Sequence, residues 1–174
     1  PYYCRGILYD VLGNREQAIV DYTASLQLDP SYVEAYVNRG KEYLVTGHFD
    51  KRIADCNQAI ALRPNFSYPY WNRGRAYAQK GDYSQALASF VQAIASQPQD
   101  VYIYLDKADA HAALQLHQQA LKDYDYVIQE TNEPMAYYKR GRVYRAIGKK
   151  VQARKDYEQE IALDPELKQF EKYV

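Results

Sequence analysis

One short string of residues returns along this chain at an almost constant interval of 34 residues. Its copies are Cys4-Arg5-Gly6, Asn38-Arg39-Gly40, Asn72-Arg73-Gly74, Asp106-Lys107-Ala108 and Lys139-Arg140-Gly141. Prolines keep the same interval, since Pro30, Pro64 and Pro98 are also 34 residues apart. A fixed period of this length is the signature of a repeat architecture, in which one small structural unit is stacked several times.

The third unit shows what each repeat contains, namely two short helices joined by a tight turn. Residues 69–80 and 84–96 both place aromatic or apolar side chains at helical spacing. Gly81 interrupts the pattern, because glycine readily takes the left-handed geometry that ends a helix, and Asp82 can cap the next helix. Pro98 then ends the second helix. A pair this short cannot bury its apolar stripe alone, so it must stack on neighbouring pairs.

The pattern Tyr70-x2-Arg73-Gly74-x2-Tyr77, followed by Ala86-x3-Phe90 and Pro98, resembles the tetratricopeptide repeat. The resemblance covers the whole chain as repeats 1–32, 33–66, 67–100, 101–133 and 134–167, with 168–174 as the start of a capping helix. It implies an all-α fold, a right-handed superhelical solenoid of antiparallel helix pairs. First helices would line a concave groove and second helices the convex back. We expect a single solenoid domain over residues 1–174, cut from a longer chain.

Small and aromatic residues recur at fixed places in the repeat. We expect close helix crossings at four glycines and at four alanines on the opposing helices: Gly6, Gly40, Gly74, Gly141, Ala18, Ala86, Ala120 and Ala153. Most of the 20 tyrosines are then packing residues. Those predicted to fill gaps between units are Tyr2, Tyr36, Tyr70, Tyr104, Tyr137, Tyr9, Tyr43, Tyr77 and Tyr144. Tyr22, Phe90, Tyr124 and Tyr157 are predicted to fill the back.

Two units depart from this pattern. In the second, Arg52 stands in the small-residue slot and Cys56 in the aromatic slot, which predicts a looser junction where the Arg52 stem snorkels past a smaller neighbour. In the fourth, Ala108, His111 and Gln115 replace glycine, tyrosine and the helix-ending glycine, and the unit is one residue short. We expect a bend near residues 131–134.

Composition excludes several classes of function. Lys plus Arg and Asp plus Glu number 22 each, so no cations are in surplus to bind nucleic acid. No apolar run approaches the ~20 residues needed to cross a bilayer, so we expect no membrane insertion. Cys4 and Cys56 are too few for a disulfide scaffold and fall at different helical positions, which favours a cytoplasmic setting, although a removed signal peptide also fits the sequence.

Catalytic and metal-binding patterns are missing from the sequence. His48, His111 and His117 lack the spacing of three or four residues that two ligands on one helix need. Asp106 and Asp109 lie one turn apart, but an ion-pair ladder between adjacent first helices explains them better than acid–base catalysis. The basic members of that ladder are Arg75, Lys139 and Arg142. We therefore expect no enzyme activity and no cofactor.

The family resemblance implies which side chains face the groove, and none is needed for hairpin packing. They are Tyr3, Cys4, Ile7, Val37, Asn38, Lys41, Tyr68, Trp71, Asn72, Arg75, Tyr102, Leu105, Asp106, Asp109, Tyr138, Lys139 and Arg142, with Arg145 beside them. Co-chaperone members grip a terminal carboxylate with Lys, Asn and Arg slots, and no register here completes that clamp. Asn38 and Asn72 either bond across the helix stack or contact a ligand.

Trp71 is the best single site residue, because Tyr70 and Gly74 already supply the packing of this unit. We expect it to lie in an amphipathic pocket with Tyr68, Arg75 and Leu105, with a cation–π contact from Arg75. The alternative is that Trp71 packs on Tyr102 and Leu105 across the repeat boundary and only stiffens the stack. Aromatic anchors beside polar groups are typical of a peptide-binding surface.

Three functions fit these features. The first is a protein–protein interaction module that binds an extended peptide or a partner helix in the groove. The second is a structural spacer or self-association scaffold, since apolar residues at the chain ends, including Leu167, Phe170 and Val174, predict weak end-to-end contacts. The third is the regulatory arm of an enzyme that lies outside this sequence.

Overall fold

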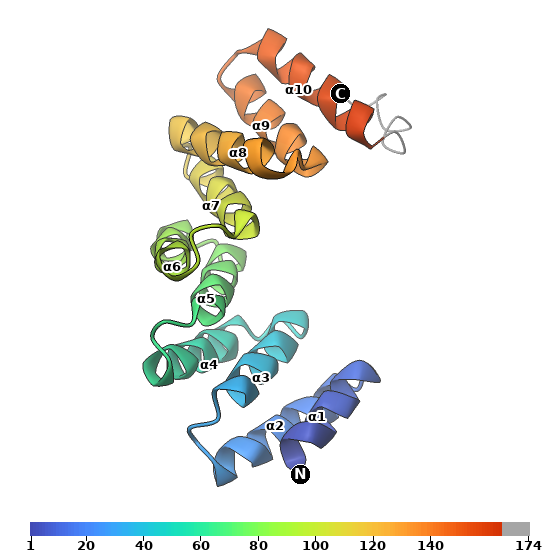
Figure 1. Cartoon of the computed structure of the whole chain (residues 1–174), viewed down its shortest axis with the longest axis vertical. Helices are drawn as coiled ribbons and strands as arrows, with labels where there is room; N and C mark the ends of the chain where they lie inside the picture. The colour runs from blue at the N-terminus through green and yellow to red at the C-terminus, as the bar shows by residue number, and fades with distance from the viewer. Residues whose placement is uncertain (165–174) are drawn as a thin grey trace. The chain divides into compact units, whose positions relative to one another are not determined.

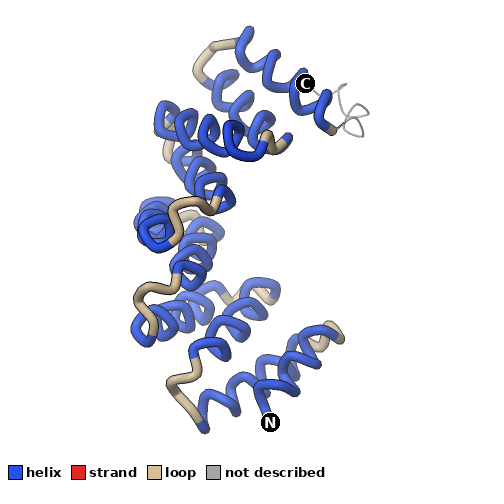
Figure 2. Tube along the Cα trace, viewed as in Figure 1, coloured by secondary structure: helices blue, strands red, loops and turns tan. Residues whose placement is uncertain are grey.

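The computed structural model describes residues 1–164 of the chain, and these residues form ten helices and no strand (Figure 2). The helices are α1 (Tyr2–Val11), α2 (Arg15–Leu28), α3 (Val33–Val45), α4 (Phe49–Leu62), α5 (Ser67–Gln79), α6 (Tyr83–Ser96), α7 (Val101–Ala113), α8 (His117–Thr131), α9 (Pro134–Ala146) and α10 (Lys150–Leu163). The predicted all-α class is confirmed. The expected capping helix at 168–174, and Leu167, Phe170 and Val174, lie outside the described residues.

The helices pack in consecutive antiparallel pairs within two compact units. The first unit, residues 1–98, holds the pairs α1–α2, α3–α4 and α5–α6 (Figure 1). The second, from residue 99 onward, holds α7–α8 and α9–α10. Within each unit the second helix of one pair packs on the first helix of the next, as α2 does on α3 and α8 on α9. This is the stacking that short hairpins require.

Left-handed residues end the first helix of each pair. Four of them are glycines, Gly13, Gly47, Gly81 and Gly148, with φ between 74° and 81°. In the fourth pair the same place holds Gln115, which keeps the left-handed φ of 60° although its side chain disfavours it. The repeat geometry therefore overrides the local preference of this residue. Between α8 and α9 the shortened link is closed by Asn132, also left-handed at φ 55°.

In three of the five hairpins the core residue is an aromatic ring of the second helix that presses on the glycine of the first helix. Phe90 is fully buried, and a Cβ atom built on Gly74 would lie 2.5 Å from its ring. Gly6 and Gly141 meet Tyr22 and Tyr157 in the same way, at 2.8 and 2.7 Å. The predicted alanines are buried as well: Ala18, Ala86, Ala120 and Ala153. Close crossings are thus confirmed at three of the four glycines.

Gly40 is the exception, and the prediction of a close crossing there was wrong. The nearest atoms to a Cβ on Gly40 are the side chains of Arg52 and Asp55, both at 3.8 Å. The reason is that Cys56 stands where other repeats carry a ring, so nothing presses on the glycine. Cys56 itself is buried, and burial raises the pKa of its thiol to about 11, which makes it a poor nucleophile. Cys4 and Cys56 are both free.

Arg52 does not snorkel to solvent, so this expectation was also wrong. Its side chain is the largest fully buried one, at 1% exposure, and it fills the space that the missing ring leaves. Nη2 donates to Asn72 Oδ1 at 2.7 Å, whereas Nε and Nη1 have no hydrogen-bond partner among the described residues. Burial lowers the pKa of Arg52 because the charged form loses its hydration.

An ion pair joins the two helices of nearly every hairpin, and sequence reasoning missed it. The basic residue before the glycine pairs with a buried aspartate 16 residues later, in Arg5–Asp21, Arg39–Asp55, Lys107–Asp123 and Arg140–Asp156. In the third hairpin Arg73 instead donates to the Ser89 hydroxyl at 3.1 Å. The aspartates follow the same period as the arginines, so the sequence did carry a signal for these pairs.

The tyrosines of the first helices are mostly half-buried, as packing residues should be, and their rings often lie under the cation of this ion pair. Arg39 lies 5.8 Å from the ring centroids of both Tyr36 and Tyr43. Tyr2 differs from the prediction, because it is 40% exposed at the start of α1.

Candidate functional site

The candidate site is the surface formed by the first helices, and in the first unit these are α1, α3 and α5. Here Tyr3 and Asn38, predicted groove residues on neighbouring helices, meet directly, since Asn38 Nδ2 donates to the Tyr3 hydroxyl at 3.1 Å. The Tyr3 ring also packs 4.5 Å from that of Tyr32. Ile7 and Val37 are half-buried beside them, and Cys4 is exposed. The first part of the surface is therefore apolar with an ordered amide.

An aromatic–cation cluster of Tyr68, Trp71 and Arg75 lies on α5. The Tyr68 and Trp71 rings meet edge to face with centroids 5.9 Å apart, and the Arg75 guanidinium carbon lies 5.5 Å from the Trp71 ring centroid. The expected cation–π contact is thus present. Tyr68 is 38% exposed, whereas Trp71 and Arg75 are half-buried. Leu105, the fourth expected member, belongs to the other unit.

Asn72 lies one residue from Trp71 but points into the helix stack. It is 5% exposed, and its amide oxygen accepts the hydrogen bond from Arg52. Asn38 is likewise engaged with Tyr3. Both asparagines therefore bond across the helix stack, which was one of the two alternatives that the sequence left open. In this arrangement the Asn72 amide helps to compensate the buried Arg52 guanidinium for its lost hydration.

In the second unit, α7 and α9 bring an acidic and a basic groove residue together. Asp109 accepts hydrogen bonds from Lys139 Nζ at 2.5 Å and from the Tyr124 hydroxyl at 2.6 Å. This is the predicted ladder between adjacent first helices, confirmed for this pair. Burial and the Asp109 carboxylate raise the pKa of Tyr124, so its hydroxyl stays a donor. The acidic fourth repeat is thus partly neutralised by the basic fifth.

The remaining groove residues of this unit range from half-buried to exposed, and Leu105 packs against the hydrophobic core, contrary to the expectation that no groove residue is needed for packing. Tyr102 is 59% exposed, Leu105 and Asp106 are half-buried, and the Arg142 guanidinium lies 5.9 Å from the Tyr138 ring centroid. Arg145 is exposed near the end of α9. These side chains offer aromatic and cationic contacts rather than a single charge sign.

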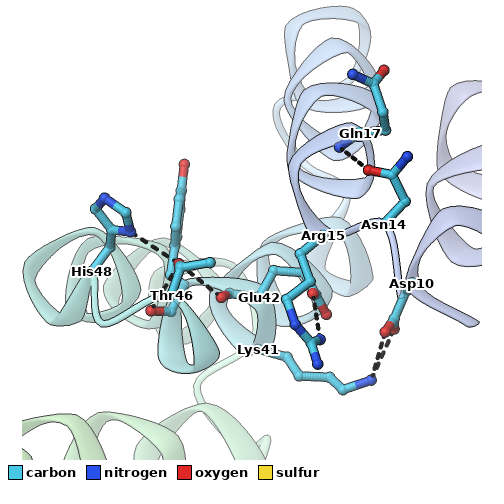
Figure 3. Close-up of polar contacts among 9 residues, drawn as sticks. Asp10, Asn14, Arg15, Gln17, Lys41, Glu42, Thr46 and His48 are labelled. Carbon is cyan, nitrogen blue, oxygen red and sulfur yellow. Dashed lines mark hydrogen bonds and ion pairs between the residues drawn. The ribbon is translucent and has the colours of Figure 1, made fainter. Parts of the chain in front are cut away.

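A polar cluster beside the groove was not predicted from the sequence. Figure 3 shows Asp10, Arg15, Lys41 and Glu42 converging where the α1–α2 turn meets α3. Lys41 Nζ donates to both Asp10 oxygens, at 2.8 and 3.1 Å, and Arg15 Nη1 donates to Glu42 Oε2 at 3.3 Å. The groove residue Lys41 is therefore held by an inter-repeat ion pair.

Glu42 is the unusual member of this cluster, because it is fully buried and its Oε1 has no hydrogen-bond partner within residues 1–164. Burial, reinforced by the nearby Asp10 carboxylate, raises the pKa of Glu42 above the ordinary value of a carboxyl group. The matching positions of the other repeats hold apolar residues: Leu8, Ala76, Ala110 and Val143. A carboxylate in this otherwise apolar slot was the sequence signal for the cluster.

No cluster of three or more metal-ligating side chains occurs within residues 1–164. None of the helices in this part of the chain is long and apolar enough to span a membrane.

Comparison with family models matches almost the whole chain to one description, "Tetratricopeptide repeat". Three such models match residues 2–32 and 33–66, 72–133, and 134–167. Two of these matches, 33–66 and 134–167, have the same bounds as two of the predicted repeats. No curated protein matches the chain significantly in sequence.

Several solved structures share the fold at low sequence identity. A crystal structure of a MamA protein is 22% identical, with a TM-score of 0.88 over 98% of this chain and 93% of that one. MamA from Desulfovibrio magneticus RS-1, from residue 41 to its end, is 14% identical, with a TM-score of 0.90 and coverage of 96% and 95%. YrrB, described as a TPR protein with an unusual peptide-binding site, is 19% identical, with a TM-score of 0.81 and coverage of 95% and 86%. At these identities the likeness concerns the fold.

Proposed function

Because the chain belongs to the tetratricopeptide repeat family, we propose that it is a non-catalytic binding module that holds an extended peptide or a partner helix on its first helices. The family and the fold support a protein–protein interaction module in general terms. The finer proposal concerns the place of binding, which is the groove surface around Trp71. YrrB, a structural neighbour described as having a peptide-binding site, supports this use of the fold.

The observation that carries the proposal is the cluster of Tyr68, Trp71 and Arg75 on α5. The hairpin already has its packing ring in Phe90 and its crossing glycine in Gly74, so these three side chains are surplus to its core. Two of them are aromatic and the third is a cation over an aromatic ring, the composition that recurs in binding hot spots. Together they offer an apolar ring edge and a guanidinium within one small area.

A ligand for this surface should be amphipathic. Its apolar side chains would cover the Tyr68 and Trp71 rings, and a carboxylate or backbone carbonyl would accept from the Arg75 guanidinium. Tyr3, Val37 and Ile7 extend the apolar part of the surface along α1 and α3. In the second unit, Lys139 and Arg142 provide basic groups on α9.

The experiment is a selection of peptides from a displayed random library on the immobilised chain, followed by measurement of the dissociation constant for the best peptide. Trp71→Ala should weaken binding by about 2 kcal/mol or more, which is roughly 30-fold, and leave the thermal melt little changed. The matched control is Tyr83→Ala, which removes a half-buried ring of the second helix in the same hairpin. Equal binding by wild type and Trp71→Ala would refute the proposed site.

The single tryptophan provides a second readout. Because Trp71 is half-buried, its emission should start between the buried and exposed limits and shift to shorter wavelength when the peptide covers it. A peptide that binds without changing this emission lies elsewhere on the molecule.

The remaining expectations are part of the same proposal. The balanced charge argues against nucleic acid as a partner, and the two free cysteines fit a reducing compartment such as the cytoplasm. A regulatory arm of a larger enzyme would use the same groove, and the flanking sequence would reveal it.

A further inference from the structure

A pocket of about 440 Å³ lies in the second unit between α7 and α8, within the size range of small-molecule sites. The side chains that matter for its chemistry are Tyr104, Lys107, His111, Lys122, Asp123 and Tyr126. All six come from one hairpin, so the pocket is complete within the fourth repeat.

The pocket lies on the opposite side of α7 from the groove. Tyr104, Lys107 and His111 recur at helical spacing and share one side of the helix. Leu105 lies about 100° round the helix axis from Tyr104, and Asp109 lies about 160° round it from His111, so both belong to the groove side. A ligand in this pocket would therefore leave the proposed peptide surface uncovered.

A substitution within the repeat pattern accounts for the open space. In the second repeat the Arg39 guanidinium lies between two tyrosine rings, and Arg140 does the same in the fifth. In the fourth repeat His111 takes the place of the second tyrosine. Lys107 accordingly lies over the Tyr104 ring, 5.2 Å from its centroid. The smaller imidazole leaves room where the other repeats have a phenol.

The polar groups of the pocket offer donors and positive charge. Asp123 is 6% exposed, and its two oxygens already accept from Lys107 Nζ at 2.7 Å and from His111 Nδ1 at 2.8 Å. Its single negative charge faces two ammonium groups, since the exposed Lys122 also lines the pocket. The donors in excess and the net positive charge call for a ligand that brings acceptors and a negative charge.

The walls of the pocket are aromatic. The Tyr104 and Tyr126 rings pack with centroids 4.2 Å apart, and the position of Tyr126 holds Ala24, Gln58, Gln92 or Gln159 in the other repeats. The fourth repeat thus adds a ring where the array otherwise has none. A ring of the ligand could pack against this pair.

We propose that this pocket binds a small aromatic oxyanion, an aryl phosphate or aryl carboxylate. The oxyanion accepts hydrogen bonds from Lys107 and Lys122, and the ring packs against Tyr104 and Tyr126. Asp123 accepts hydrogen bonds from Lys107 and His111 and so fixes the positions of these two side chains.

The test is a titration of the full chain, labelled with ¹⁵N for NMR, with phenyl phosphate, benzoate and inorganic phosphate. At least one aryl anion should give saturable shifts of α7 and α8 amides with a dissociation constant of about 1 mM or tighter, and inorganic phosphate should bind at least about tenfold more weakly. Which of the two aryl anions binds more tightly identifies the oxyanion that the site prefers.

Three variants distinguish binding in this pocket from nonspecific attraction of the anion to positive charge. His111→Tyr restores the tyrosine of the other repeats and should fill the pocket, so binding should be lost while the helical content stays. Lys122→Gln should weaken binding about tenfold, whereas Lys155→Gln, in the same slot of the fifth repeat, should not. Shifts that do not saturate, equal affinity for inorganic phosphate, or undiminished binding by His111→Tyr would overturn the proposal.

Discussion

The glycines at the helix crossings give a sharp test of the packing, because two of them occupy the same slot in different surroundings. A methyl group on Gly74 would lie 2.5 and 2.6 Å from two carbon atoms of the fully buried Phe90 ring. A methyl group on Gly40 would find no atom nearer than 3.8 Å, which is ordinary van der Waals contact. The same substitution should therefore have opposite effects on stability in adjacent hairpins.

The magnitudes follow from two opposing terms. Alanine is favoured over glycine within a helix by about 1 kcal/mol, and overpacking a close crossing costs about 1–3 kcal/mol. Gly40→Ala should thus stabilise the protein by up to about 1 kcal/mol, while Gly74→Ala should destabilise it by up to about 2 kcal/mol. Gly74→Leu should cost more still, and Gln79→Leu, at an exposed position of α5, should be nearly neutral.

The assay is urea denaturation followed by circular dichroism, with the midpoints of the variants compared. A further step tests the cause directly. Arg52→Ala combined with Cys56→Phe gives the second repeat the ring that the third has in Phe90, and in this background Gly40→Ala should become destabilising. Two results would refute the argument that the ring of the second helix determines how much space a side chain has at the glycine. One is an equal change of stability at Gly40 and Gly74, and the other is that Gly40→Ala still stabilises the protein in the Phe background.

Two further stability predictions follow from single residues. Gln115→Gly should stabilise the protein by about 1 kcal/mol, because the left-handed φ of 60° costs a side chain roughly 1–2 kcal/mol; Gly81→Gln should have the opposite sign, and urea midpoints of both variants check this. In the wild type, Glu42 should make the free energy of unfolding fall as the pH rises, and Glu42→Gln should remove this fall. The folded state raises the pKa of Glu42, so its protonated form is favoured below the unfolded value of about 4.3, and the benefit is lost as pH rises through the folded pKa. Unfolding free energies measured from pH 4 to 8 should therefore decline less in Glu42→Gln than in wild type. Glu34→Gln is the control with the opposite sign, since hydrogen bonds from its own backbone and from Arg63 lower the pKa of Glu34, and an unchanged slope in Glu42→Gln would contradict the assignment.

The repeat period was sufficient to predict most of the fold. A nearly constant interval places most of the glycines, rings and prolines at equivalent points of successive hairpins, so the helices, their turns and the buried alanines follow from one unit. Even Gln115, which lacks the preferred chemistry, takes the left-handed geometry that its slot demands. Packing between repeated units thus outweighs the local preference of a single residue.

The period could not predict which groups a polar side chain contacts when it stands where the other repeats have a small or apolar residue. The sequence predicted that the Arg52 guanidinium would reach solvent, because a guanidinium is costly to bury. In the structure the Arg52 side chain is buried instead, in the space that the small Cys56 side chain leaves where other repeats have a ring. Glu42 was overlooked because its burial depends on the preceding hairpin rather than on its own helix. For the groove, the pattern correctly placed Arg75 over Trp71 and Lys139 next to Asp109.

The most direct test of the central claim is to locate a bound peptide on the surface of the chain. A photoreactive phenylalanine analogue would replace Tyr68, which is exposed beside Trp71 on α5, and in a second variant Val91, which is exposed on the second helix of the same hairpin. The selected peptide should cross-link from position 68 and not from position 91, and Trp71→Ala should abolish the adduct. Cross-linking from position 91 alone would contradict binding along the first helices.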